Sequence, residues 1–401
     1  MSETFLQRCE KIIGSENVDL KADPPLFCPD GEQELCEIVR NAYSGDHKII
    51  VTGAGTYPLS CAIPHALHVS TRALSSIKEV SPGDYLMVVQ SGCVVDEAVG
   101  EAEKYGLFLT LDITSGDSAT VGGAYMTGAV GLSSLKYGPF SKSVIGVRCV
   151  TAQGDSVTFG GRTTKNVTGY DVTRFLAGTM GIYGLALDVT IKLQPFPELR
   201  LIASGGFKRQ AELLKAVNTL SQTFRNASKF ELVATEGLGW ETQLGIGFDG
   251  IDFLVKRDIQ KAKNIMADTG AVSVGDEHPR QFMAKRRKAG RKIADSGLFT
   301  FSLPPMSSGV FLEKISMISQ EIPLIGHLLT GRFHILCTET AMLERITETA
   351  LAIGGKLPVE WGYAAKKGIS GLFTGPELEI ARAIKRELDP KGIFNPHMRL
   401  L

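Results

Sequence analysis

Three glycine clusters, each next to an apolar run typical of a strand, constrain this 401-residue chain more than any other feature. The first is "VTGAGTYPL", residues 51–59, in which Gly53 and Gly55 follow the apolar run "KII". A G-x-G-x-x-G dinucleotide fingerprint needs a third glycine where the next helix packs on the strand, but here that position holds Pro58. The turn therefore does not open a Rossmann helix, although its backbone N–H groups suit a diphosphate.

The second and third clusters lie further along the chain. Residues 119–138, "ATVGGAYMTGAVGLSSLKYG", hold too many glycines for a helix and too much polarity for a buried strand. A flexible surface loop is the alternative, but strand-like runs on both sides indicate that the segment is anchored. In "LAGTMGIYGLALDV", Gly178, Gly181 and Gly184 precede another apolar run. Three such turns would suit an extended ligand with a diphosphate at its waist.

Composition excludes several classes of protein. The 43 basic and 43 acidic residues balance, so no global field recruits nucleic acid or an anionic membrane. The basic stretch "KRRKAGRK", residues 285–292, is the exception, and we interpret it as a solvated helix face in preference to a docking strip for a polyanion or an acidic partner. No apolar run is long enough to span a membrane and the N-terminus lacks the apolar centre of a signal peptide. We expect a cytoplasmic protein, or one peripheral at the membrane through partners, with reduced cysteines.

The pattern of short runs predicts an α+β chain in three parts. Residues 1–198 show strand-like runs ended by turns and close with "LQPFPE". Residues 199–345 alternate strand and helix patterns, which suits a sheet covered by helices on one face. Residues 346–401 end in an amphipathic helix that stops at Asp389-Pro390 and return to the first part.

In this order the clusters resemble the PCMH-type FAD-binding domain of the vanillyl-alcohol oxidase superfamily. The stretch "FGGRTTKNVTGYDVTRFLAG" is most similar to the GlcE-like FAD-binding subunit of glycolate oxidase, and "LDPKGIFNPHMRL" resembles the tail of FAD-linked 2-hydroxy-acid oxidases. The resemblance implies a PCMH-type domain of two α+β subdomains and a cap domain whose antiparallel sheet is covered by helices. Lys165, Asn166, Tyr170 and Asp171 match the GlcE-like motif, although Asp171 is as well explained as the N-cap of a helix beginning at Val172.

The resemblance also implies a set of FAD-binding residues. The first turn would bind the pyrophosphate, the second cluster would run along the cofactor, the third would lie near the adenine, and the C-terminus would return toward the flavin ring. The residues are Gly53, Ala54, Gly55, Thr56, Tyr57, Ser115, Thr120, Gly122, Gly123, Thr127, Gly128, Gly131, Tyr137, Gly138, Gly181, Gly184, Leu185 and Asn395. Relatives with covalent flavin place a His in the first turn, where this chain has Thr56, so we expect non-covalent FAD.

The sequence offers fewer recognisable residues for substrate binding and catalysis than for the cofactor. Related D-2-hydroxy-acid dehydrogenases hold a metal with histidines from a cap strand and from an acidic turn, but "TGRFHILCTE" offers His334 and "VEWGYAAKKG" has no histidine. One imidazole does not make a metal site, so no metal is expected. A base is still needed for the hydroxyl proton. The candidates His334, Glu360, Tyr363, Lys366 and His397 are not distinguished by their spacing.

Three functions remain open at this point. The chain is either the FAD-binding electron-relay subunit of a heteromeric glycolate- or lactate-type dehydrogenase, or a self-sufficient FAD oxidoreductase of an alcohol or 2-hydroxy acid with a metal-free pocket. The third is a scaffold subunit with a degenerate site. The first predicts a sister flavin subunit and an iron–sulfur subunit as partners, and a small 2-hydroxy acid or another electron donor as the source of electrons.

Overall fold

The computed structural model describes residues 3–22, 25–56, 66–163, 169–238, 241–294, 298–360 and 375–396. The chain divides into two compact units. Unit 1 consists of Met1–Val130, Pro139–Phe196 and Gly362–Leu401, and unit 2 consists of Gly131–Gly138 and Pro197–Trp361. The polypeptide therefore leaves unit 1 twice and returns to it twice, and the two units are described separately below.

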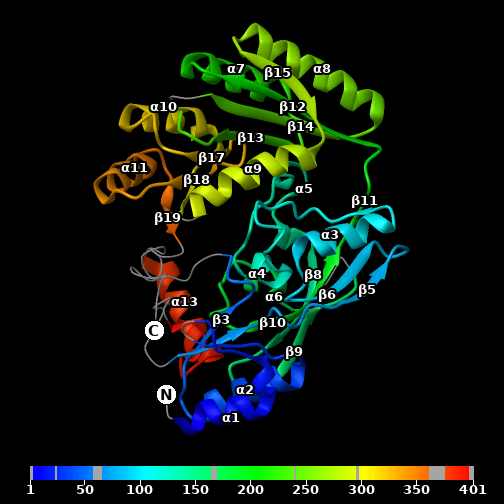
Figure 1. The fold of residues 1–401 in the computed structure, drawn as a ribbon, viewed down its shortest axis with the longest axis vertical. Helices are drawn as coiled ribbons and strands as arrows, with labels where there is room; N and C mark the ends of the chain where they lie inside the picture. Colours follow the sequence, from blue (N-terminus) through cyan, green and yellow to red (C-terminus); the bar gives the residue numbers. More distant parts are fainter. Residues whose placement is uncertain are drawn as a thin grey trace. The chain divides into compact units, whose positions relative to one another are not determined.

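Unit 1 begins with a small sheet backed by helices (Figure 1). Its elements are α1 (Glu3–Ile13), η1 (Ser15–Asn17), β1 (Val18–Asp19), β2 (Leu26–Phe27), α2 (Glu32–Ser44), β3 (Ile49–Thr52) and β4 (Leu67–Ser70). The strand order is β1-β2-β4-β3, with β4 parallel to both β2 and β3. Leu35, Ile38, Val39 and Ala42 lie on one face of α2 at helical spacing and are fully buried. The sheet and its helices thus fix the direction in which β3 leads into the first glycine turn.

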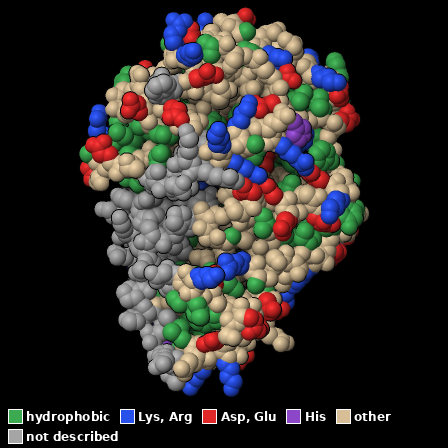
Figure 2. Space-filling view, in the orientation of Figure 1, with side chains coloured by type: hydrophobic (Ala, Val, Ile, Leu, Met, Phe, Trp, Pro, Cys, Tyr) green, Lys and Arg blue, Asp and Glu red, His purple; other side chains and the backbone are tan. Residues whose placement is uncertain are grey.

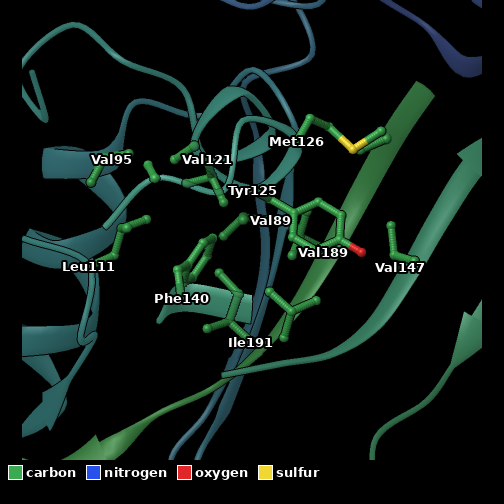
Figure 3. Close-up of a cluster of buried hydrophobic side chains, with 14 of the residues drawn as sticks. Val89, Val95, Leu111, Val121, Tyr125, Met126, Phe140, Val147, Val189 and Ile191 are labelled. Carbon is green, nitrogen blue, oxygen red and sulfur yellow. The ribbon is translucent and has the colours of Figure 1, made fainter. Parts of the chain in front are cut away.

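A second, antiparallel sheet in unit 1 has the strand order β5-β6-β10-β8-β9. This part contains β5 (Ile77–Ser81), β6 (Leu86–Gln90), α3 (Val95–Lys104), β7 (Leu107–Phe108), α4 (Val121–Met126), η2 (Phe140–Lys142), β8 (Val144–Val150), β9 (Ser156–Gly160), α6 (Val172–Leu176), β10 (Leu185–Lys192), β11 (Gln194–Pro195) and, near the C-terminus, α13 (Gly375–Leu388). Side chains from β6, β8 and β10 meet those of α3 and α4 in the core drawn in Figure 3. β8 and β9 pair as a hairpin, and Gly154 in the turn between them has a φ of +86°.

The second glycine cluster is partly helical, which corrects the expectation that it forms no helix. The Thr120 hydroxyl accepts a hydrogen bond from the Gly123 N–H (3.1 Å) and so caps α4. A Cβ at Gly122 would lie 2.4 Å from the Ser91 Cβ, so close packing requires glycine at that position. The cap and this contact explain why a glycine-rich sequence forms a short helix here.

Unit 2 is built on one eight-stranded antiparallel sheet with the order β15-β12-β14-β13-β17-β18-β16-β19. Its elements are α5 (Ser134–Tyr137), β12 (Leu199–Phe207), α7 (Gln210–Thr223), β13 (Lys229–Ala234), β14 (Thr242–Gly250), α8 (Asp252–Asp268), β15 (Ser273–Glu277), α9 (Pro279–Ala294), β16 (Leu298–Ser302), η3 (Pro305–Ser307), α10 (Ser308–Ile318), β17 (Leu324–His327), β18 (Arg332–Leu336), α11 (Thr340–Ala352) and β19 (Lys356–Glu360). The antiparallel sheet covered by helices is as expected.

Helices cover both faces of this sheet, not one as the sequence indicated. Figure 1 shows α7 and α8 on one side and α9 on the other. Along β12 the two faces alternate, because a Cβ at Gly205 would meet Met266 of α8, whereas Ile202 packs with Phe282 of α9. The α9 face carries the polar cluster described below.

The distribution of surface charge does not distinguish between the candidate functions. On the side drawn in Figure 2, basic and acidic side chains are interspersed, as the balanced composition predicts. Among the described residues, none of the helices combines the length and apolar character needed to cross a bilayer.

Candidate functional site

The first glycine turn and the start of α4 are in direct contact in unit 1. Gly53 follows β3, and a Cβ placed on it would lie 2.3 Å from the Thr120 Oγ1. The Ser70 hydroxyl donates a hydrogen bond to the Gly53 carbonyl (2.7 Å), which holds the turn against β4. Thr127 Oγ1 donates to the Gly123 carbonyl (2.8 Å) at the other end of α4. Two clusters that are far apart in the sequence therefore form one surface.

The third glycine cluster joins this surface through backbone hydrogen bonds. The Gly178 N–H donates to the Tyr125 carbonyl (3.1 Å), and the Met180 N–H donates to the Met126 carbonyl (2.7 Å). A Cβ on Gly128 would lie 3.2 Å from the Gly178 Cα, so the two glycines allow the backbones to approach closely. The turn at residues 178–181 is thus attached to the C-terminal end of α4.

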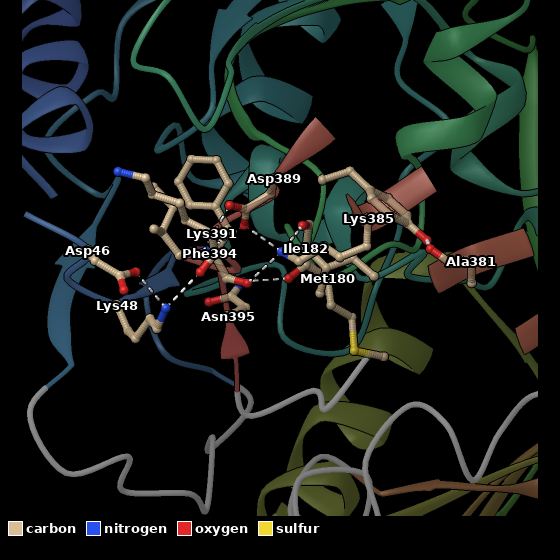
Figure 4. Close-up of polar contacts among 12 residues, drawn as sticks. Asp46, Lys48, Met180, Ile182, Ala381, Lys385, Asp389, Lys391, Phe394 and Asn395 are labelled. Carbon is tan, nitrogen blue, oxygen red and sulfur yellow. Dashed lines mark hydrogen bonds and ion pairs between the residues drawn. The ribbon is translucent and has the colours of Figure 1, made fainter. Parts of the chain in front are cut away.

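Asn395 closes the arrangement from the C-terminal end of the chain. Its Oδ1 accepts a hydrogen bond from the Val51 N–H (2.9 Å), and its Nδ2 donates to the Met180 carbonyl (2.6 Å), as Figure 4 shows in part. The residue is 4% exposed and has a φ of +45°, a conformation that asparagine tolerates better than most residues. One side chain therefore links the strand before the first glycine turn to the third turn.

A buried ion pair fixes the segment that carries Asn395. Lys385 Nζ contacts Asp389 Oδ2 and the Ile182 carbonyl, both at 2.6 Å, and the Phe394 carbonyl at 3.1 Å (Figure 4). The Asp389 carboxylate also accepts hydrogen bonds from the Ile393 and Phe394 N–H groups. Burial lowers the pKa of Lys385, although Asp389 opposes the shift. The pair ties α13 and the C-terminal turn to the third glycine cluster.

The joined turns, which we call the glycine cradle (residues 53–56, 120–128, 178–181 and Asn395), fit a flavin nucleotide. Ala54 and Gly55 are exposed. Gly55 has a φ of +67° and nothing within 4 Å of its ideal Cβ position, so its conformation and not packing calls for glycine. Exposed backbone N–H groups in such a turn form an anion nest that suits a pyrophosphate. Backbone donors and small side chains are the groups that the FAD hypothesis requires.

The remaining predicted cofactor residues have other local surroundings or lie outside the described residues. Gly131, Tyr137 and Gly138 belong to unit 2. Leu185 is 1% exposed and packs in a core of unit 1, and a Cβ on Gly184 would lie 3.2 Å from the Val150 carbonyl oxygen. The Ser115 carbonyl accepts a hydrogen bond from the Ala119 N–H. Tyr57, Lys165, Asn166, Tyr363, Lys366 and His397 lie outside the described residues, and so does the side chain of Glu360 at the end of β19.

Asp171 caps α6, which confirms the structural interpretation of that residue in the GlcE-like motif. Its carboxylate accepts a hydrogen bond from the Arg174 N–H (3.1 Å), and the helix begins at Val172. Tyr170 is 96% exposed.

The α9 face of the unit 2 sheet carries buried charges. Lys229 Nζ lies 2.8 and 2.7 Å from the two carboxylate oxygens of Asp249, and Arg200 Nε lies 3.5 Å from the same carboxylate. Burial raises the pKa of Asp249, but the attraction of Lys229 and Arg200 outweighs it and the pKa is lowered. Lys136, from the short segment of unit 2 at residues 131–138, donates to the Asp249 carbonyl (2.6 Å). This hydrogen bond holds that segment on the sheet.

A second group on the same face centres on Arg286 of α9. Its Nε lies 2.7 Å from Glu231 Oε1, and the two groups form an ion pair that lacks the alignment of a regular hydrogen bond. Its Nη2 lies 2.9 Å from His327 Nε2. Arg286 and Glu231 are both about 1% exposed or less. The basic stretch at residues 285–292 is therefore not wholly a solvated helix face, because one of its arginines is buried in unit 2. We call Arg286, Glu231, His327 and His334 the arginine–histidine cluster.

The two histidines of this cluster come from neighbouring strands. His327 lies on β17 and His334 on β18, and their ring centroids are 5.9 Å apart. His334 Nδ1 is 3.0 Å from the Thr300 Oγ1. Burial, and then the positive charges of Arg286 and Arg332, hold the pKa of both imidazoles well below the ordinary value, so both are neutral at pH 7.

Sequence reasoning found His334 but missed His327 and Arg286. The strand β17, "LIGH", has four residues and lies between Pro323 and a turn, so its pattern is too short to stand out. The available signal was the spacing of the two histidines in "HLLTGRFH", which suits two strands joined by a tight turn. Among the described residues, no group of three or more His, Cys, Asp or Glu side chains is arranged to hold a metal ion.

Two known families match separate parts of the chain. Residues 25–160 match the FAD binding domain family, and residues 241–398 match the family described as FAD linked oxidases, C-terminal domain. The solved structure of an alkyldihydroxyacetonephosphate synthase superposes with a TM-score of 0.75, covering 99% of this chain and 86% of that one, at 15% identity. That likeness concerns the fold.

Curated relatives with similar sequences include several oxidoreductases. The glycolate oxidase subunit GlcD of Bacillus subtilis is 26% identical, covering 92% of this chain and 87% of the relative. The mitochondrial D-2-hydroxyglutarate dehydrogenase of Bos taurus is 24% identical over 94% of this chain and 76% of the relative. The D-lactate dehydrogenase of Archaeoglobus fulgidus is 24% identical over 92% and 89%, respectively.

Proposed function

Because this chain is an FAD-dependent oxidoreductase, built from an FAD binding domain and the C-terminal domain of FAD linked oxidases, we propose that it oxidises the hydroxyl group of a small 2-hydroxy acid. The observation that carries the proposal is the glycine cradle, in which three distant backbone turns and Asn395 are joined by hydrogen bonds and close backbone contacts. The substrate class follows relatives named for glycolate, D-lactate and D-2-hydroxyglutarate.

Unit 1 supplies the cofactor site in this proposal. Backbone N–H groups of residues 53–56 bind the pyrophosphate without a lysine, and the cap at Thr120 keeps α4 in place beside them. No His stands in the first turn, so the flavin is held non-covalently. Bound FAD supplies the hydride acceptor. The side chain of Asn395 keeps the first and third turns at a fixed separation.

Unit 2 supplies the candidate base. His334 is neutral at pH 7, and Thr300 holds its Nδ1 side. A neutral imidazole accepts the hydroxyl proton of the substrate. Among Glu360, Tyr363, Lys366, His397 and His334, we choose His334 because it is a neutral imidazole at pH 7 and its Nδ1 lies 3.0 Å from the Thr300 hydroxyl.

Membership of a heteromeric complex is the second candidate. Relatives named as glycolate oxidase subunit GlcD favour it, and the sequence resemblance to the GlcE-like subunit belongs to the same hypothesis. In that case unit 1 holds FAD as an electron relay, a sister flavin subunit oxidises the substrate, and an iron–sulfur subunit takes the electrons.

Anaerobic reduction of the flavin separates the two candidates. The purified chain is reconstituted with FAD, mixed with glycolate, D-lactate or D-2-hydroxyglutarate, and followed by the loss of flavin absorbance. Reduction by any of them supports autonomous oxidation, and a His334→Gln variant should retain FAD but be reduced at least about a hundredfold more slowly. If all three acids leave the flavin oxidised, autonomous oxidation of this substrate class is rejected. Near-stoichiometric flavin in either case excludes a purely structural subunit.

A further inference from the structure

The arginine–histidine cluster contains the residue types of a metal site. Two imidazoles on adjacent strands and a carboxylate, Glu231, share the α9 face of the sheet. His327 Nε2 lies 3.5 Å from Glu231 Oε1. Neutral imidazole and carboxylate are common ligands of zinc and similar divalent ions.

The contact with Arg286 changes what this group can bind. A guanidinium has five N–H donors and no acceptor, so the 2.9 Å contact requires His327 Nε2 to accept the hydrogen bond. The Nε2 lone pair is then in use, and the proton of the neutral ring stands on Nδ1. This assignment follows from the chemistry of arginine and needs no observed hydrogen.

The same guanidinium engages the carboxylate. Arg286 Nε lies 2.7 Å from Glu231 Oε1, so the guanidinium bridges the carboxylate and His327. A divalent ion bound by both groups would have to stand where the guanidinium is. Because arginine stays protonated at every physiological pH, it does not yield that place by losing its proton.

We propose that Arg286 takes the place of a metal ion in this cluster: it holds His327 as the Nδ1–H tautomer, neutralises Glu231 and closes the pair of histidines to divalent cations. Arg286 is in this sense a positioning residue, not a catalytic one. The proposal does not depend on which alcohol the enzyme oxidises, and its tests do not use activity.

Metal binding to variants provides the first test. EDTA-treated protein is dialysed against Zn²⁺, and bound zinc is measured by mass spectrometry. Wild type and His327→Gln should bind the same background amount, whereas Arg286→Ala should gain about one zinc per chain, because a carboxylate and an imidazole are released together. Arg286→Ala/His327→Gln should lose that gain. Wild-type zinc that disappears in His327→Gln, or no gain in a folded Arg286→Ala, would overturn the proposal.

The tautomer of His327 provides a test that needs no change at Arg286. Nitrogen NMR of ¹⁵N-histidine-labelled wild type, with His327 assigned by its disappearance in His327→Gln, should show a neutral Nδ1–H ring from pH 5.5 to 8. An arginine that did not donate to Nε2 would leave the ring free to carry its proton on Nε2. An Nε2–H ring or an imidazolium in that range contradicts the proposal.

Discussion

The link formed by Asn395 predicts that the first and third glycine turns loosen together when its amide is removed. We choose Asn395→Gly because glycine accepts the φ of +45° without strain, so that the loss is confined to the side chain. The change leaves the Val51 N–H and the Met180 carbonyl without their partner. Each unsatisfied buried group costs about 1–3 kcal/mol, so the upper limit for the pair is roughly 2–6 kcal/mol, because both hydrogen bonds are partly buried.

Hydrogen exchange measures this cost locally. A loss of about 2 kcal/mol corresponds to about thirtyfold faster exchange, which should appear in peptides covering residues 49–56 and not in those covering β8 and β9. Asn395→Asp is the matched control, because it keeps the acceptor for Val51 and the same shape but replaces the donor to Met180. It should expose the 178–181 turn more than β3. FAD should bind more weakly to both variants, because ordering the two turns is then added to the cost of binding. Unchanged exchange and unchanged flavin content in Asn395→Gly would refute the assignment of Asn395 as the link.

Three further predictions concern the cofactor turn, the C-terminal ion pair and the buried histidines. Gly55→Asp should abolish FAD retention, because it places a carboxylate where the diphosphate binds. The control Gly55→Asn accepts the same φ without charge and should keep part of the flavin. Equal flavin absorbance in purified Gly55→Asp and wild type would disprove this placement of the diphosphate. Lys385→Met should destabilise unit 1 by about 3–5 kcal/mol, because Asp389 is then buried without its cation. The urea midpoint should fall and proteolysis after α13 should become faster. An unchanged urea midpoint would contradict this prediction. The lowered pKa values of His327 and His334 mean that the unfolded chain binds protons that the folded chain does not, so the free energy of unfolding should decrease as the pH falls below about 6.5, by about 1.4 kcal/mol per pH unit for each histidine. Urea midpoints between pH 5 and 8 should be less pH-dependent in His327→Gln, and identical slopes would be evidence against the buried neutral ring.

Local patterns were sufficient for most of the elements in unit 1. The runs before Gly53 and after Gly184 become β3 and β10, and the turn at Gly154 joins β8 to β9, because strand-like runs and turn residues act over a few positions. Asp171 caps α6 for the same local reason. The helix predicted to stop at Asp389-Pro390 ends at Leu388. These features depend on neighbouring residues, which a single sequence displays directly.

The arginine–histidine cluster could not be found in this way. Glu231, Arg286 and His327 come from β13, α9 and β17, and they meet only because the strand order places β13 beside β17 and α9 packs across both. A run of basic residues is ordinarily solvated, and nothing in "KRRKAGRK" marks Arg286 as the residue that turns toward the sheet. Its burial depends on a carboxylate more than fifty positions earlier in the chain.

The second glycine cluster is divided between the two units, and its glycines have different roles in each. Its first part forms α4 in unit 1, where Thr120, Gly122 and Gly128 lie close to Gly53, Ser91 and Gly178, respectively. Its second part belongs to unit 2, where Leu132 packs with Phe282 and Lys136 donates to the Asp249 carbonyl. Only eight residues, Gly131–Gly138, make this excursion before the chain returns to unit 1. Glycine density here therefore reflects both the close backbone contacts of α4 in unit 1 and a chain that changes units twice over a short distance.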